Sequence, residues 1–157
     1  MIFEGEYLNG KRNGKGKEFY YNDNLKFEGK YLNGKQWNGK IFEKMIREIF
    51  ELKNGEGNIK IYDYYGNLLY EGEYVNGEKN GKGKEYYKNG KLKFEGEYLN
   101  GERNGKGKEY YLSGRLKFEG EYLNGKRNGI GEEYIDNINN NLKVRARYLD
   151  GKIEFTL

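Results

Sequence analysis

Pairs of glutamates recur along the chain, and their spacing is one that catalytic carboxylates can have. Glu95 and Glu97 lie two residues apart where apolar and charged residues alternate, so on a strand both carboxylates point to one face, about 7 Å apart. That separation could suit a glycosidase. Lys106 and Lys108 follow on a return segment and are expected to lie across from the glutamates. We therefore interpret the pairs as cross-strand ion pairs, each worth from zero to about 1 kcal/mol.

The motif Gly-Lys-Gly occurs at 14–16, 81–83 and 105–107 and superficially suggests a phosphate-binding loop. Such a loop needs the longer Walker spacing and a helix that follows it directly. None of the three copies has either feature, so phosphate binding is not expected.

The residue types that most enzymes use are nearly absent. The sequence has no Cys and no His, and its one Ser and one Thr are Ser113 and Thr156. This composition offers no thiolate or imidazole to a metal and no Ser/His or Cys/His pair for nucleophilic catalysis. We expect a non-enzymatic protein without metal, cofactor or disulfide bonds.

Basic residues occur at the predicted turns and could gather on one edge as a stripe. Anionic lipid headgroups attract such a stripe by about 1 kcal/mol per residue. Glu78 and Glu102 interrupt it, and with 29 basic against 25 acidic residues the net charge is only +4, so nucleic acid is not the expected partner. The candidate lipid-binding residues are Lys11, Arg12, Lys79, Arg103, Lys126 and Arg127.

All of these motifs belong to one repeated unit. The pattern [FY]-E-G-[EK]-Y-[LV]-N-G opens at 3, 27, 70, 94 and 118, and the steps from 3 to 27, 70 to 94 and 94 to 118 are each 24 residues. A fixed period indicates a repeat architecture. We therefore treat 1–157 as a single array.

Residues 92–117 show the structure expected of one unit. Period-two alternation over 92–99 predicts a half-buried strand, two Asn-Gly pairs predict tight turns, and 106–111 predicts a return strand. Each copy is therefore a β-hairpin. Because a glycine inside a strand usually marks a close approach, we expect an aromatic ring of the adjacent hairpin to lie over Gly96 and its equivalents.

The unit also resembles a known family. Residues 70–83, YEGEYVNGEKNGKG, are similar to the MORN (membrane occupation and recognition nexus) repeat, and the likeness covers nearly the whole chain in five clear copies. The resemblance implies an all-β fold of stacked hairpins in an elongated, twisted single-layer sheet with a groove. It also implies a scaffold or dimerising module, with lipid binding proposed for some members. The 24-residue period further resembles a bacterial variant that is antitoxin-like.

Residues 35–69 depart from the period, because the openings at 27 and 70 are 43 residues apart, five short of two units. Apolar pairs at 41/42, 45/46 and 49/50 fit one face of a helix over 41–53, but they also fit two short strands joined at 44–47. Remnants of the Asn-Gly motif on both sides favour the shortened hairpin.

The same segment holds the sole tryptophan and the most apolar run, which form either local core or a patch for a protein partner, since aromatic anchors are typical of interfaces. Three tyrosines that end return strands are further candidates. The candidate partner-binding residues are Trp37, Phe42, Ile46, Phe50, Tyr20, Tyr87 and Tyr111.

At the C-terminal end the pattern decays over 142–157, where Arg145 and Arg147 replace glutamates, and we expect capping strands there. Phe3 already lies in a predicted strand, which leaves an edge that could pair with another copy. No secretory signal and no apolar stretch of about 20 residues is visible, so a cytoplasmic location is expected. The expected function is a scaffold that binds a protein partner, and the first candidate for this partner is a second copy of the chain in a homodimer. A peripheral module for anionic lipids and an antitoxin-like inhibitor of a partner protein are the alternatives.

Overall fold

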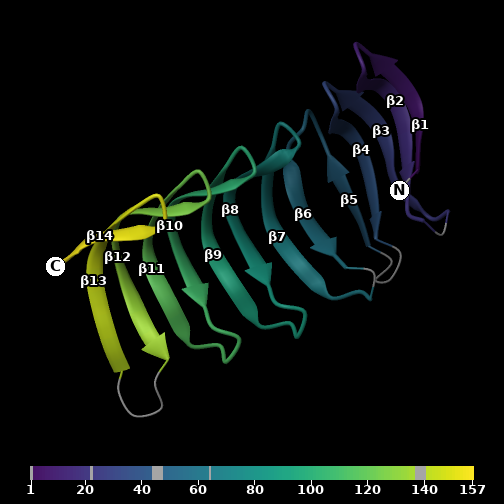
Figure 1. Cartoon of the computed structure of the whole chain (residues 1–157). Helices are drawn as coiled ribbons and strands as arrows, with labels where there is room; N and C mark the ends of the chain where they lie inside the picture. The colour runs from purple at the N-terminus through teal and green to yellow at the C-terminus, as the bar shows by residue number, and fades with distance from the viewer. Residues whose placement is uncertain (1, 22, 44–47, 64, 137–140) are drawn as a thin grey trace.

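The computed structural model describes residues 2–21, 23–43, 48–63, 65–136 and 141–157, and every regular element in them is a β-strand (Figure 1). The first sheet contains β1 (Ile2–Leu8), β2 (Lys11–Phe19), β3 (Leu25–Leu32), β4 (Lys35–Glu43) and β5 (Glu48–Leu52). The second contains β6 (Gly57–Tyr62), β7 (Leu68–Val75), β8 (Glu78–Tyr86), β9 (Leu92–Leu99), β10 (Glu102–Tyr110), β11 (Leu116–Leu123), β12 (Lys126–Asp136), β13 (Asn141–Leu149) and β14 (Lys152–Thr156). Within each sheet consecutive strands are antiparallel neighbours, so the predicted all-β stack of hairpins is confirmed.

Each hairpin tip is an Asn-Gly or Asp-Gly pair with both residues at positive φ, as at Asn100 (φ 51°) and Gly101 (φ 89°). Such a two-residue turn matches the twist of its flanking strands. The tips are also tied to one another. The Gly101 amide donates to the Lys79 carbonyl of the preceding hairpin at 2.9 Å, and the Gly125 amide donates to the Arg103 carbonyl at 2.9 Å. A line of hydrogen bonds therefore runs along one edge of the array.

The two faces of each sheet differ, and we call them the ring face and the charged face. The ring face carries the buried aromatic residues, and the charged face carries the alternating Lys and Glu residues. On the ring face, aromatic rings of neighbouring hairpins pack edge-to-face: the ring centroids of Phe94 and Tyr122 are 5.2 Å apart. Arg103 and Glu109 are six residues apart on β10, yet their side chains approach to 3.6 Å, so the strand bends toward the ring face. The buried aromatic residues are Phe27, Tyr31, Tyr70, Phe94, Tyr98, Phe118, Tyr122 and Tyr148.

Paired glycines make room for these rings. Gly96 of β9 lies opposite Gly107 of β10. A Cβ at Gly107 would lie 2.6 Å from the Phe94 ring, and a Cβ at Gly96 would lie 2.7 Å from the same ring. The prediction that the adjacent hairpin supplies the covering ring was therefore wrong for Gly96, because Phe94 of its own strand bends over the pair. Tyr122 of the next hairpin approaches Gly107, where a Cβ would be 3.2 Å away.

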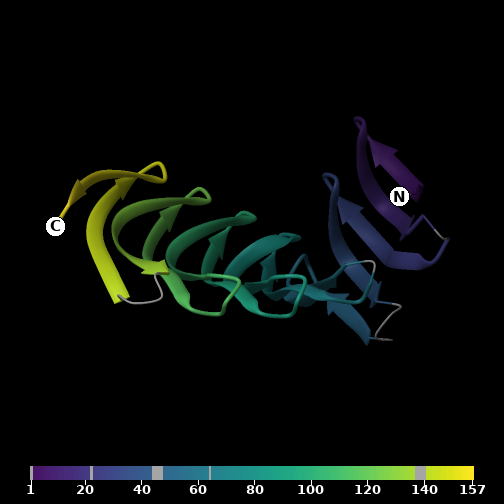
Figure 2. The ribbon, with the colours of Figure 1, turned by 60° about the horizontal axis from the view of Figure 1, so that its bottom comes forward.

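The prediction of one continuous sheet was also wrong, since β5 and β6 enter different sheets after a single bridge between Lys53 and Glu56 (Figures 1 and 2). A row of facing glycines crosses each sheet. In both sheets this row stops at the strand next to the break. Leu52 of β5 lies opposite Gly39, and Ile59 of β6 lies opposite Gly72. Both side chains are 2% exposed. Leu52 and Ile59 belong to one buried cluster, so side-chain packing joins the two sheets where the backbone pairing is interrupted.

The tips stay joined across this break. Trp37 of β4 stands where regular hairpins have an Asn-Gly bulge, and its ring would be 2.8 Å from a Cβ at Gly55. The Gly55 amide donates to the Trp37 carbonyl at 2.6 Å, and the Gly77 amide donates to the Gly55 carbonyl at 2.9 Å. An ion pair of 2.8 Å between Lys35 and Glu78 adds to the contact.

The described part of the irregular segment forms strands on both sides of 44–47. The shortened hairpin is therefore supported, and the helix over 41–53 was wrong. The predicted turn at 44–47, including Ile46, lies outside the described residues. At the other end, β13 and β14 occupy the segment where capping strands were expected.

Candidate interaction surfaces

Two of the predicted lipid-binding residues are held inside the array instead of lining an edge. The Arg103 guanidinium makes a 2.8 Å ion pair with Glu85 of the preceding hairpin and lies 4.0 Å from the Phe94 ring centroid. Arg127 repeats the arrangement one hairpin later, 3.0 Å from Glu109 and 4.0 Å from the centroid of the Phe118 ring. Their side chains are 18% and 14% exposed.

These arginines set the charge of their acidic partners. Burial alone would raise the pKa of Glu85, but hydrogen bonds from Arg103 and Tyr98 outweigh it and lower the pKa to about 2. The pKa of Glu109 is lowered in the same way, by Arg127 and Tyr122 acting against its burial. Both carboxylates therefore stay ionised and tie one hairpin to the next.

The other four basic residues divide into two kinds. Arg12 lies 4.3 Å from the Phe3 ring centroid and 3.5 Å from Glu18. The ammonium group of Lys79 lies 4.1 Å from the Tyr70 ring centroid, and burial lowers its pKa. Lys11 and Lys126 are exposed. The six residues thus do not form one exposed stripe, and their role in lipid binding stays a prediction.

The predicted partner residues of the irregular segment do not share one face, because Phe50 pairs with Ile41, the neighbour of Phe42, and so lies on the other side of the first sheet. Trp37 is half-buried over Gly55, as described above, and Phe42 is half-buried in β4. Phe50 of β5 packs against the core cluster that spans the two sheets, from Phe27 of β3 to Ile59 of β6. Ile46 lies outside the described residues. Ile49, which sequence reasoning did not single out, is 58% exposed.

The three strand-end tyrosines link successive hairpins at the edge opposite the tips. Tyr87 donates to the carbonyl of Tyr110 at 2.8 Å, and Tyr111 donates to the carbonyl of Tyr134 at 2.9 Å. Tyr20 donates to the Glu43 carboxylate at 3.3 Å. Their hydroxyls therefore serve the stack, and a role in partner binding stays a prediction.

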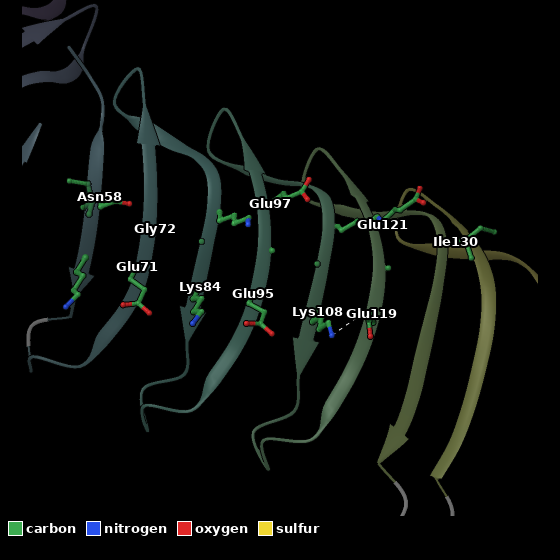
Figure 3. Close-up of a pocket in the computed structure, with 18 of the residues that line it drawn as sticks. Asn58, Glu71, Gly72, Lys84, Glu95, Glu97, Lys108, Glu119, Glu121 and Ile130 are labelled. Carbon is green, nitrogen blue, oxygen red and sulfur yellow. Dashed lines mark ion pairs between the residues drawn. The ribbon is translucent and has the colours of Figure 1, made fainter. Parts of the chain in front are cut away.

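A groove of about 970 Å³ runs across the charged face of the second sheet (Figure 3). Its floor is the backbone of the facing glycines, and the Lys and Glu side chains on either side of them form its walls. Figure 3 shows Glu71, Lys84, Glu95, Lys108 and Glu119 in one row beside it. The glutamate pairs were correctly predicted to face lysines: Lys108 lies opposite both Glu95 and Glu119, with a 3.2 Å ion pair to Glu119.

The described residues add no candidate metal centre to these surfaces. No group of three or more Asp and Glu side chains among them could hold a metal ion. The same part of the chain contains no helix with the length and hydropathy needed to cross a bilayer.

The comparison with protein families agrees with this architecture. A model of the MORN repeat matches residues 3–25, 70–91, 94–114 and 118–137, which is more than half of the chain. The chain therefore belongs to the MORN repeat family, whose repeats are generally modules for protein or lipid interaction and typically not catalytic. The comparison with curated proteins gave no significant match.

Proposed function

We propose that the protein is a non-enzymatic scaffold that binds a second copy of itself through β1 and β14, the outer strands of the two sheets. The observation that supports this most is the exposure of Tyr7. Its side chain is 60% exposed, whereas the tyrosines at the same place in four other hairpins are 2–4% exposed. Those four are Tyr31, Tyr98, Tyr122 and Tyr148.

Inside the array such a tyrosine has two kinds of contact with the preceding hairpin. Tyr98 packs on Tyr70, with ring centroids 5.5 Å apart, and donates a 2.7 Å hydrogen bond to Glu85. Tyr7 instead packs edge-to-face on Phe3 of its own strand, at 5.3 Å. A strand added beside β1 would cover the exposed part of the Tyr7 ring.

The outer strand β14 has matching features. It is paired with β13, and Ile153 and Phe155 are 47% and 46% exposed. Ile153 pairs with Tyr148 in the same way that Arg127 pairs with Tyr122. By this equivalence, the carbonyl of Ile153 is the next acceptor in the line of tip hydrogen bonds. In a head-to-tail pair the Gly10 amide of one copy reaches that carbonyl of the other, and the sheet continues. Such a contact is heterologous and can add further copies.

The test is the solution mass of the protein over a range of concentrations, by size-exclusion chromatography with light scattering. We expect the mass to rise above 18.5 kDa with concentration. The variant Tyr7→Lys places a charge in the proposed contact and should stay monomeric. Tyr21, which is 90% exposed and outside the strands, supplies the control: Tyr21→Lys should assemble as the unmodified protein does.

A constant mass of 18.5 kDa at all concentrations would overturn the proposal. So would equal assembly of the two variants, since Tyr7 would then lie outside the contact. Small-angle X-ray scattering adds a check on geometry, because head-to-tail pairing lengthens the particle without widening it.

A further inference from the structure

The charged face of the second sheet carries a regular pattern of charge that the core does not require. Each of the strands β8 to β11 presents two side chains of the same sign, one on each side of the groove, and β7 contributes Glu71. Glu95 and Glu97 are both on β9, and Lys106 and Lys108 are both on β10. Because the sign alternates from strand to strand, the face is crossed by negative and positive stripes about 4.8 Å apart.

Hydrogen bonds hold several of these groups in place. The Tyr86 hydroxyl donates to the Glu71 carboxylate at 2.5 Å, and the Tyr110 hydroxyl donates to the Glu95 carboxylate at 2.6 Å. Burial, together with the bond to Glu95, raises the pKa of Tyr110. The negative stripes are therefore preorganised, which lowers the entropy cost of binding.

A row of apolar side chains runs beside the stripes near the tips. Leu99 follows Glu97 by two residues and so shares its face, and Leu123 follows Glu121 in the same way. Leu99, Leu123 and Leu149 are 48%, 49% and 54% exposed. They lie on alternate strands, so they repeat at about 9.6 Å, the same period as the negative stripes.

We propose that this face binds an amphipathic α-helix of a protein partner, lying across the strands along the groove. Two turns of helix, or seven residues, advance about 10.5 Å, close to the period of about 9.6 Å between like stripes. A helix with basic residues in one turn and acidic residues in the next meets stripes of opposite sign throughout. Its apolar residues, spaced by seven, then meet the leucine row.

Other ligands fit this pattern less well. Side chains on one face of an extended strand repeat at about 6.8 Å and lose register with the stripes after one step. A polyanion such as a nucleic acid or a lipid surface meets the glutamate stripes as well as the lysines. The helix accumulates a mismatch of about 3 Å over three periods, which flexible lysine stems can absorb.

The first sheet offers a matched control because its stripes are interrupted. Glu28 and Lys30 give β3 both signs, and Asn38 stands on β4 where a lysine would continue the pattern. Its groove has a similar volume, about 830 Å³. A partner that only needs lysines and glutamates would bind both sheets equally.

The experiment uses two synthetic helical peptides of about 20 residues, enough to span the leucine row at 1.5 Å per residue. One has leucine at every seventh position, with lysines on one helical turn and glutamates on the next in alternation. The other has the same composition with the charged positions shuffled. Titration calorimetry should detect the first peptide and not the second, and binding should weaken with added salt.

Two charge-reversal variants then locate the site. Lys106→Glu with Lys108→Glu changes a stripe of the second sheet and should weaken binding about tenfold. Lys15→Glu with Lys17→Glu is the control in the first sheet and should leave binding unchanged. Lys17 makes a 2.9 Å pair with Glu28 and Lys108 a 3.2 Å pair with Glu119, all four side chains being 43–49% exposed. Each variant therefore loses one exposed ion pair of this kind.

Equal binding of the two peptides would overturn the proposal, as would equal loss in the two variants. Failure of both peptides, with a mass that falls in Lys106→Glu/Lys108→Glu, would assign the face to a second copy and would also overturn it. The inference does not depend on self-association through β1 and β14, which Tyr7→Lys tests separately.

Discussion

The hydroxyl of Tyr98 donates a 2.7 Å hydrogen bond to the carboxylate of Glu85 in the preceding hairpin. The same bond joins Tyr122 to Glu109 at 2.8 Å. Because each of these bonds crosses from one hairpin to the next, it opposes the separation of neighbours. Repeat proteins derive much of their stability from such neighbour interfaces.

Removing this hydroxyl should therefore destabilise the array with little change in packing. Tyr98→Phe keeps the ring, which is 4% exposed, and deletes one hydrogen bond to a charged group. We expect the free energy of unfolding to fall by about 2 kcal/mol, measured by urea denaturation. Tyr21→Phe, at a side chain that is 90% exposed, should be neutral. An unchanged midpoint for Tyr98→Phe would show that water replaces the bond at no cost.

Replacing Arg103 should distinguish charge from geometry. Arg103→Met removes the partner of Glu85, whose side chain is 18% exposed, and should cost about 2–3 kcal/mol because a half-buried carboxylate loses its cation. Arg103→Lys should cost less, about 1 kcal/mol, since Lys79 occupies the same place over Tyr70 one hairpin earlier. Thermal unfolding would rank the variants. Equal losses would mean that the planar guanidinium, and not the charge, is required.

Acid should weaken the array over a defined range of pH. The pKa of Glu85 is lowered from 4.5 to about 2 in the folded protein, and those of Glu18 and Glu109 are also lowered. A carboxylate with a lowered pKa stabilises the fold above its unfolded pKa and loses this contribution as pH falls. We expect the unfolding free energy to decline from about pH 4.5 to about pH 2. Glu85→Gln should reduce the slope, and an identical slope would count against the assignment.

Glu43 should respond in the opposite direction. Its side chain is buried, 8% exposed, and burial raises its pKa despite the 3.3 Å hydrogen bond from Tyr20. A raised pKa means that stability is present below the unfolded pKa and is lost as pH rises through the folded value. Glu43→Gln should therefore stabilise the protein at pH 7 by about 1 kcal/mol and have little effect at pH 4. Glu18→Gln is the matched comparison and should destabilise at pH 7.

A double substitution tests how the glycines and rings depend on each other. Gly96→Ala places a Cβ 2.7 Å from the Phe94 ring and equally close to the Gly107 Cα and the Lys106 carbonyl oxygen, and it should cost about 3 kcal/mol, of which Phe94→Val can relieve only the ring contact. The strand β13, next to the outer strand β14, already has Ala146 at this position and Val144 at the position of the phenylalanine. Phe94→Val combined with Gly96→Ala should therefore cost less than the sum of the single changes. Simple additivity in urea denaturation would contradict the contact.

The hairpin itself could be predicted from the sequence because its determinants are local. Alternation over 92–99 set the strand, and Asn100-Gly101 set the tip, where both residues do have positive φ. The pairing of Glu95 with Lys108 depends on one further feature, because a bulge between Arg103 and Gly107 shifts the register that the turn imposes. The 24-residue period then fixed the order of the hairpins.

The ion pairs between arginines and glutamates of successive hairpins could not be predicted in the same way. Arg103 reaches Glu85 only because β10 bends toward the ring face, and a linear pattern of residues contains no bend. The break between the sheets coincides with Leu52 and Ile59, which interrupt the row of glycines. Comparison of the irregular segment with the regular units could have shown these two exceptions, since both residues stand where every regular unit has glycine.

The 24-residue repeat makes the length of the array adjustable without a change of any contact type. If residues 94–117 are excised, Lys93 is joined to Phe118 and the partners are exchanged like for like. Arg127 takes Glu85 in place of Glu109, as Arg103 does now. The Gly125 amide meets the carbonyl of Lys79, as the Gly101 amide does now. A gene for this protein can therefore lose or gain a whole unit by recombination. The product remains a regular stack of hairpins with a different length.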